Sequence, residues 1–176
     1  YKRQGYNLED LENTDPKLIK EMRNFYFDQI ESYKKNKNKK ITIDKMPLNL
    51  VHVGEILRFF PNAKFILALR HPYDCVLSCF MQNFMLNHAM ANFLNLDDTL
   101  KLYDLTMSLW KRYTNVFAID HHLIRYEDVV SNFKKTIGDL LKFLNVKWSD
   151  NVTEFYKTAE KRGIINGKKN ENLGFP

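Results

Sequence analysis

The stretch FPNAKFILALRHPYDCVLSCF, residues 60–80, joins two apolar segments through a turn that carries Arg70, His71 and Pro72. Its first half is dominated by apolar side chains and bounded by turn residues, which is typical of a strand buried on both faces of a parallel sheet. Pro72 fits the first position of a following helix, where its missing N–H costs nothing. The stretch therefore predicts a strand over 63–69, with Arg70 at its carboxyl end, and then a helix.

The residues before this stretch predict a second strand and a connecting helix. Residues 41–44 (ITID) are short and β-branched, and residues 49–60 place apolar side chains at helical spacing. Strand, helix and strand in this order form a βαβ unit, so the sequence predicts an α/β fold with a short parallel sheet and helices on both faces.

Helical periodicity and β-branched runs predict the remaining elements. Asp15 followed by Pro16 is a good helix start, because a capping side chain precedes a proline at the first helical position. The predicted helices cover residues 15–35, 73–86, 96–113, 132–144 and 149–160, and a further predicted strand covers 121–128. We expect one domain over 1–176: an N-terminal helix and basic loop (1–40), a core (41–146), and a C-terminal helix and tail (147–176).

Composition leaves several function classes open. The chain has 176 residues and a net charge of +6, which suits an anionic ligand but does not by itself imply nucleic acid. The lysine run of residues 34–40 has no interleaved aromatic residues, so we interpret it as a solvated loop, and a nucleic-acid or acidic-protein surface is its alternative.

The cysteines and the apolar runs bear on the compartment. Cys75 and Cys79 are four residues apart in a predicted helix, with no third and fourth ligand for a metal, so two reduced thiols are expected. The apolar runs are too short to span a bilayer, and we see no export signal. We therefore expect a cytoplasmic protein, and the start at Tyr1 indicates a piece of a longer polypeptide.

The turn after the central strand has the features of a phosphate site. Ligands of parallel sheets bind outside the carboxyl ends of the strands, and a helix start offers free N–H groups. The Arg70 guanidinium and the Ser78 hydroxyl, two turns into the helix, can both bind phosphate oxygens. The alternative is that Arg70 pairs with Asp74 and Ser78 bonds a helical carbonyl, and spacing leaves both open.

The block DKMPLNLVHVGEILRFFPNAKFILALRHPYDCVLSCF, residues 44–80, resembles the central part of sulfotransferases that use 3′-phosphoadenosine 5′-phosphosulfate (PAPS). The similarity is greatest to bacterial sulfotransferases that are often joined to tetratricopeptide repeats, and more distant to tyrosylprotein sulfotransferases. A second block, LIRYEDVVSNFKKTIGDLLKFLNVKW, residues 123–148, resembles the family's Arg-Tyr-Glu-Asp strand and following helix. The matching positions of the first block are Lys45, Pro47, Phe60, Pro61, Ala63, Lys64, Arg70, Pro72, Asp74 and Ser78.

The resemblance assigns roles to particular residues. It implies that Arg70 and Ser78 bind the 3′-phosphate of the nucleotide, that Tyr126 contacts the adenosine, and that Lys45 stabilises charge on the bridging oxygen at the reacting centre. It also implies that Glu127 and the aspartate after it are structural rather than an acid–base pair. The implied fold is a three-layer sheet like that of the P-loop NTPases.

Several parts of the family pattern are missing from these residues, among them a Ser/Thr-rich stretch and a Gln-Val-x-x-Pro motif near the C-terminus, where this chain has GKKNENLGFP, residues 167–176. The family's glycine-rich 5′-phosphosulfate loop, and the catalytic base that follows it, are expected upstream of Tyr1. Residues 162–169 (RGIINGKK) superficially resemble a phosphate loop, but Gly163 and Gly167 are one residue too close for a Walker A pattern. His52 is the nearest imidazole to Lys45, and we interpret it as a packed or solvated helix residue.

The resemblance implies an enzyme that transfers a sulfuryl group from PAPS to an acceptor hydroxyl or, as the lesser alternative, an amine. The scheme needs no metal, no nucleic acid and no membrane span; its partners are the nucleotide co-substrate and an unknown hydroxyl-bearing acceptor. Two other classes remain as alternatives: a fragment of a P-loop kinase or NTPase, and a non-catalytic basic binding module.

Overall fold

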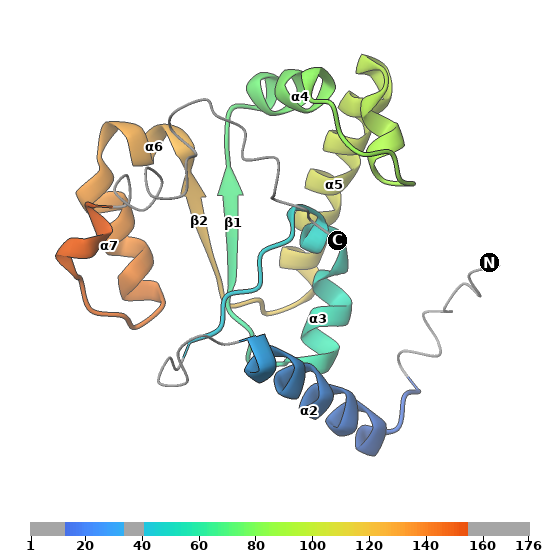
Figure 1. Cartoon of the computed structure of the whole chain (residues 1–176), viewed down its shortest axis with the longest axis vertical. Helices are drawn as coiled ribbons and strands as arrows, with labels where there is room; N and C mark the ends of the chain where they lie inside the picture. The colour runs from blue at the N-terminus through green and yellow to red at the C-terminus, as the bar shows by residue number, and fades with distance from the viewer. Residues whose placement is uncertain (1–12, 34–40, 155–176) are drawn as a thin grey trace. The chain divides into compact units, whose positions relative to one another are not determined.

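The computed structural model describes residues 13–33 and 41–154 of the chain (Figure 1). The chain divides into two compact units, residues 1–127 and 128–176, which we describe separately. The basic run of residues 34–40 and the C-terminal tail lie outside the described residues. The division into 1–40, 41–146 and 147–176 stays a prediction.

The sheet of the first unit consists, in the part of the chain that is described, of two parallel strands. β1 (Phe65–Leu69) pairs with β2 (His121–Arg125), with Phe65 opposite His121 and Leu69 opposite Arg125. Both arrows point the same way in Figure 1, so the two carboxyl ends lie side by side. The predicted combination of helices with a small parallel sheet is confirmed at this level, whereas the three-layer arrangement stays a prediction.

The predicted strand over residues 41–44 is wrong. Residues 41–46 have no regular secondary structure, so the predicted βαβ unit over 41–69 does not form among the described residues. The physical reason is that β-branched residues favour extended backbone, but a strand also needs a hydrogen-bonding neighbour. The parallel connection that does form runs from β1 through two α-helices and a short 3₁₀ helix to β2.

The helices of the first unit follow the predicted ones with shifted ends. Pro47 opens a 3₁₀ turn, so the predicted helix over 49–60 becomes a 3₁₀ segment followed by a short α-helix. The helix after β1 ends at Met81, five residues before its predicted end. The elements are α2 (Pro16–Tyr33), η1 (Pro47–His52), α3 (Val53–Phe59), α4 (Pro72–Met81), η2 (Met90–Phe93) and α5 (Leu96–Val116).

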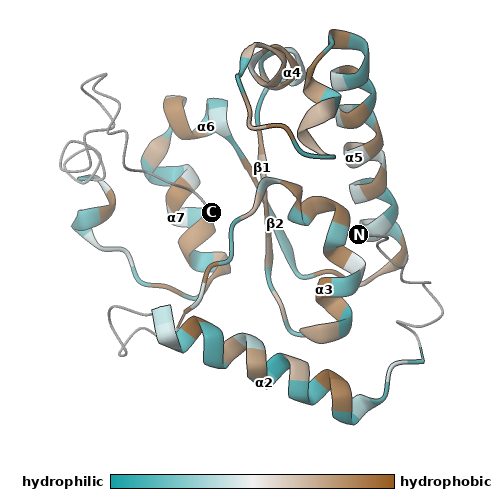
Figure 2. Cartoon of the chain, turned by 45° about the vertical axis from the view of Figure 1, so that its right-hand side comes forward, coloured by the Kyte–Doolittle hydropathy of each residue, from teal (hydrophilic) through white to brown (hydrophobic). Residues whose placement is uncertain are grey.

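Helix α5 is the centre of packing in this unit. Its N-cap is Asn95, whose side chain accepts the Asp98 N–H at 2.8 Å, and it contacts α4, η1, η2 and α3. Helices α3 and α5 lie on the same side of β1 in Figures 1 and 2, and hydrophobic and hydrophilic residues alternate along α2. The core side chains are Ile19, Val53, Val76 and Trp110, with the buried threonines Thr99 and Thr106.

The contact between α3 and α5 is close at Gly54. The Tyr113 hydroxyl donates to the Val51 carbonyl at 3.0 Å, which holds the ring against the start of α3. A Cβ at Gly54 would stand 3.3 Å from that ring, closer than ordinary van der Waals contact. At the other end of α3, the Arg23 Nε–H of α2 donates to the Phe59 carbonyl at 2.6 Å.

The second unit contains α7 (Phe133–Phe143) and the short η3 (Asp150–Val152). Helix α6 (Tyr126–Ser131) begins in the first unit and ends in the second. The predicted helix over 132–144 is confirmed, and it ends in an αL cap because Asn145 has a φ of 56°. Of the predicted helix over 149–160, only the residues up to 154 are described, and they contain the 3₁₀ segment η3 and a turn.

No helix among the described residues is long and apolar enough to cross a membrane.

Candidate anion-binding site at the strand ends

Parallel pairing of β1 and β2 brings Arg70 and Tyr126 together. Leu69 and Arg125 are opposite each other at the last position of the ladder, so the next residue of each strand leaves the sheet at the same edge. The Arg70 guanidinium carbon lies 5.3 Å from the centroid of the Tyr126 ring. This is the geometry of a cation–π contact, and it joins two of the predicted site residues across 56 positions of sequence.

Arg70 also pairs with Asp74, as the alternative from spacing predicted. Its Nη2 lies 3.6 Å from Asp74 Oδ2, and the two side chains are 45% and 56% exposed. An ion pair this open to water is worth about 0–1 kcal/mol. The guanidinium can therefore exchange Asp74 for another anion at little cost.

The start of α4 is tied to β2 through Glu127. The His71 N–H donates to Glu127 Oε1 at 2.8 Å. Two backbone N–H groups, first that of Glu127 itself and then that of His71, hold the pKa of the Glu127 carboxyl below its ordinary value. His71 is the N-cap of α4, but its own side chain makes no capping hydrogen bond.

Ser78 lies on α4 about two turns beyond Pro72, and it is exposed. Among the described residues its hydroxyl has no hydrogen-bond partner, so the alternative in which it bonds a helical carbonyl is not realised. No hydrogen bond joins Ser78 to Arg70 in the described part of the chain. The structure thus brings Arg70 and Tyr126 into contact and leaves the Ser78 hydroxyl open.

Lys45 belongs to a different hollow of the first unit. It lies in the irregular segment 41–46 and lines, together with the C-terminal half of α2, an open hollow of about 370 Å³. The Tyr26 hydroxyl donates to Asp44 Oδ2 at 2.9 Å in this hollow. The lining residues are Tyr26, Ile30, Tyr33, Thr42, Ile43, Asp44 and Lys45.

The Tyr26–Asp44 contact changes the chemistry of the tyrosine. Burial, then the hydrogen bond to Asp44 and its negative charge, raise the pKa of Tyr26 from 10.0 to about 12. Tyr26 therefore remains a neutral hydroxyl donor at physiological pH. His52, the nearest imidazole to Lys45 in sequence, lies with Nδ1 3.0 Å from Glu55 Oε2 on the exposed side of its helix.

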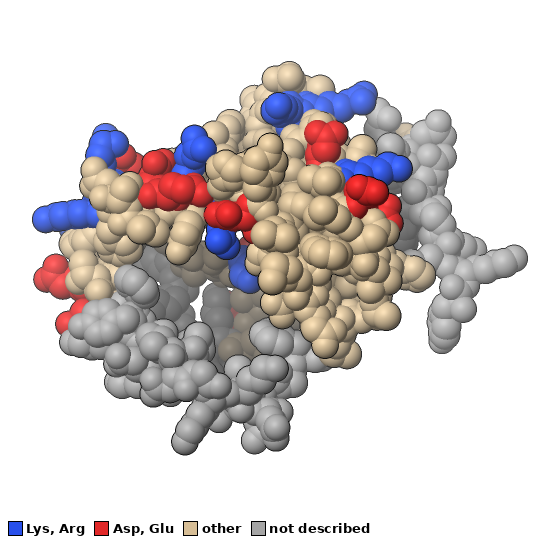
Figure 3. Space-filling view, turned by 90° about the horizontal axis from the view of Figure 1, so that it is seen from above, with Lys and Arg blue, Asp and Glu red and all other residues tan. Residues whose placement is uncertain are grey.

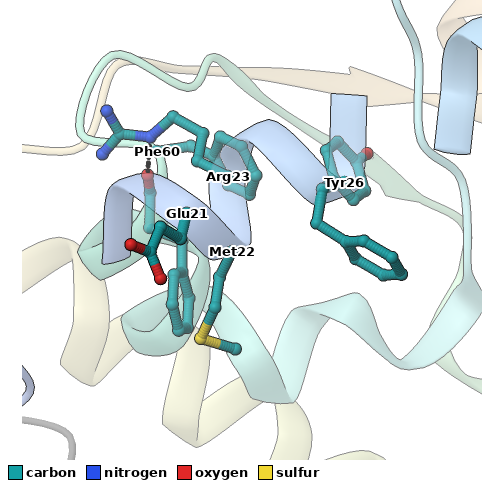
Figure 4. Close-up of a pocket in the computed structure, with 7 residues that line it drawn as sticks. Glu21, Met22, Arg23, Tyr26 and Phe60 are labelled. Atoms are coloured by element: carbon teal, nitrogen blue, oxygen red, sulfur yellow. Dashed lines mark hydrogen bonds between the residues drawn. The ribbon is translucent and has the colours of Figure 1, made fainter. Parts of the chain in front are cut away.

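A larger apolar hollow of about 490 Å³ lies between α2 and the end of α3 (Figure 4). The Arg23 hydrogen bond to the Phe59 carbonyl crosses it, and Tyr26, Phe27 and Phe60 form an aromatic cluster with centroids 5.0–5.7 Å apart. Its lining contains none of the residues of the strand ends. We interpret it as the packing seam of α2 on α3.

Charge on the face toward which both strands point is mixed. Lys and Arg side chains lie beside those of Asp and Glu in this view (Figure 3). Within residues 13–33 and 41–154, no three His, Cys, Asp or Glu side chains gather in a way that could hold a metal ion. Among the described residues, the strand ends therefore offer an anion a few placed donors.

The sequence did not identify His71 and Glu127 as parts of this site. The position of Glu127, directly after Tyr126 at the carboxyl end of a predicted strand, could have indicated a site residue. Its hydrogen-bond partner, however, is the backbone N–H of His71. A backbone donor has no residue type of its own, so a sequence cannot reveal it.

Comparison with known proteins gives one family. A model of the Sulfotransferase family matches residues 4–150. A protein of Aquifex aeolicus, named only as uncharacterized, is 30% identical over 148 residues, which cover 82% of this chain and 19% of the relative. Protein-tyrosine sulfotransferase 1 of Danio rerio is 28% identical over 176 residues, which cover 96% of this chain and 46% of the relative. The chain thus spans less than half the length of either curated relative.

Proposed function

Because the chain belongs to the sulfotransferase family, we propose that the complete protein transfers a sulfuryl group from PAPS to an acceptor hydroxyl or, less favoured, an amine. In this proposal the strand ends of the described structure bind the 3′-phosphate of the nucleotide. The observation that supports it most is the Arg70 guanidinium held over the Tyr126 ring at the carboxyl edge of the sheet.

Each residue of the strand ends has a role in this proposal. Arg70 exchanges its exposed partner Asp74 for the 3′-phosphate, which offers two oxygens to the guanidinium fork. Ser78 donates its open hydroxyl to the same phosphate. Tyr126 keeps the guanidinium in place with its ring and contacts the adenosine beside it.

Lys45 is proposed to act at the reacting centre. The sulfuryl group moves from the 5′-phosphate to the acceptor oxygen: the new S–O bond forms as the bridging S–O bond breaks, and a base takes the acceptor proton. The ammonium of Lys45 stabilises the negative charge that the leaving phosphate gains. The open hollow lined by Lys45, Tyr26 and Asp44 would give an acceptor access to the Lys45 ammonium.

The acceptor in this proposal is a molecule that carries a hydroxyl group. The name of the Danio rerio relative, protein-tyrosine sulfotransferase 1, makes a tyrosine hydroxyl one candidate. The exposed ring of Tyr33 and the exposed side chain of Ile43 at the hollow suit an acceptor with an apolar or aromatic body.

Binding of adenosine 3′,5′-bisphosphate, compared with adenosine 5′-monophosphate, tests the nucleotide part of the proposal. By calorimetry on the 176-residue chain, we expect a preference for the bisphosphate that Arg70→Ala removes. Arg112→Ala is the matched control, because Arg112 is an exposed arginine of α5 outside the site. Equal binding of the two nucleotides, or a preference that survives in Arg70→Ala, would reject the proposal.

A further inference from the structure

We propose that Glu127 is a positioning residue of the anion site: its carboxylate fixes the backbone between β1 and α4, so that Arg70 faces the anion from above the Tyr126 ring. The identity of the anion rests on the proposed function. The positioning rests on contacts of the described residues alone.

Two contacts cross between the strand ends in opposite directions. The side chain of Arg70, at the end of β1, lies 5.3 Å from the ring of Tyr126, at the end of β2. The side chain of Glu127, the next residue of that chain, accepts the backbone N–H of His71 at 2.8 Å. Each segment therefore contributes one side chain that contacts the other segment. The two contacts involve neighbouring residues, Arg70 and His71 after β1 and Tyr126 and Glu127 after β2.

The start of α4 at His71 has little side-chain support from its own turn. His71 is the N-cap of α4 without a side-chain capping bond, and the next residue, Pro72, has no N–H to donate. The His71 carbonyl accepts the Cys75 N–H at 3.0 Å as the first hydrogen bond of α4, whereas the His71 N–H takes its acceptor from outside the turn. The Glu127 carboxylate is this acceptor, a single peptide unit away from Arg70.

An arginine side chain that is preorganised before binding holds an anion more tightly than a mobile one, since less side-chain entropy is lost on binding. The contribution of Glu127 is as a hydrogen-bond acceptor, because its negative charge by itself opposes a nearby phosphate. A glutamine keeps the carbonyl acceptor and removes the charge, whereas an alanine removes both. The two substitutions therefore separate positioning from electrostatics.

The donor side of the same hydrogen bond can be removed as well. His71 has a φ of −48° and a ψ of 129°, which proline tolerates. His71→Pro deletes the N–H, and a proline can still adopt the backbone conformation of this residue. His71→Ala is its matched control, because it keeps the N–H and removes only the ring. Asp128→Asn is the control for a lost carboxylate one residue along the chain.

The test measures the dissociation constants of adenosine 3′,5′-bisphosphate and adenosine 5′-monophosphate by calorimetry for these variants. We expect Glu127→Ala and His71→Pro each to weaken bisphosphate binding about tenfold and the monophosphate much less, as for loss of one hydrogen bond to a charged group. The double variant should be no weaker than either single one, because both remove the same bond. Glu127→Gln, His71→Ala and Asp128→Asn should stay within about threefold of the wild type.

A second readout needs no ligand. In the NMR spectrum, the ring current of Tyr126 changes the chemical shift of the Arg70 Nε–H. Glu127→Ala should therefore move this chemical shift toward that of a free arginine, and Glu127→Gln should not. Equal weakening of both nucleotides, additive losses in the double variant, or an unmoved Arg70 resonance would each overturn the positioning role. If the wild type bound neither nucleotide, the proposed function would fail, and the Arg70 resonance would still decide the role of Glu127.

Discussion

Two clusters of the first unit contain the same three kinds of residue, a tyrosine, an aspartate and a cation, but connect them differently. At the strand ends, Arg70 lies over the face of the Tyr126 ring and pairs with Asp74. At the hollow beside α2, the Tyr26 hydroxyl donates to Asp44, and Lys45 lines the same hollow. The first cluster uses the ring of its tyrosine and the second uses the hydroxyl, so residue composition alone does not define a site.

Exchanging the type of cation is expected to have the largest effect. Arg70→Lys keeps the charge but removes the planar fork, so we expect about tenfold weaker binding of adenosine 3′,5′-bisphosphate. The matched exchange Lys45→Arg should leave that affinity within about twofold, because it keeps the positive charge beside the leaving 5′-phosphate, where the proposal requires a charge but no planar fork. Calorimetry on both variants checks this, and equal losses would mean that the two clusters bind the same phosphate.

Removing the tyrosine hydroxyl should lower the free energy of unfolding more at the hollow beside α2 than at the strand ends. Tyr26→Phe deprives Asp44 of its donor and should lower the free energy of unfolding by about 1 kcal/mol. Tyr126→Phe keeps the ring under Arg70 and should change the free energy of unfolding by less than about 0.5 kcal/mol. Urea unfolding of both variants measures the difference, and the reverse order of losses would show that the hydroxyl matters at the strand ends.

The titration of Tyr26 gives a further distinction. Its pKa is raised from 10.0 to about 12, so the stability that its neutral form provides is complete below pH 10 and is lost as the pH rises through about 12. Asp44→Asn should lower this pKa but leave it above the ordinary value, because burial is the largest cause. Difference absorbance of tyrosinate between the wild type and Tyr26→Phe follows this residue. A difference signal that titrates near the ordinary tyrosine pKa of 10.0 would contradict the assignment.

The smallest effect is expected at Asp74. Asp74→Asn removes an exposed ion pair, so the free energy of unfolding should change by less than about 0.5 kcal/mol. The affinity for adenosine 3′,5′-bisphosphate should rise about two- to threefold, since the carboxylate no longer competes for the guanidinium. Asp104→Asn, an exposed aspartate of α5, is the control. Weaker nucleotide binding in Asp74→Asn would show that Asp74 supports Arg70 in the bound state.

The elements with strong local signals were predicted well. The apolar run before Arg70 is β1, Pro72 opens α4, and residues 132–144 contain α7. The prediction of a strand at 41–44 was wrong, since its β-branched residues indicate extended backbone but cannot supply a neighbouring strand. For the site, the sequence singled out Arg70 and Tyr126, and their roles toward the nucleotide stay predictions.

Local signals were enough to predict the order of strand, turn and helix around Arg70, because apolar runs, a proline and helical periodicity act between near neighbours in the chain. The tertiary structure decided which groups meet there. The contacts of Arg70 with Tyr126 and of His71 with Glu127 each span 56 residues and exist because β1 and β2 are parallel and in register. Such contacts follow from strand pairing, which depends on the whole fold rather than on any one segment.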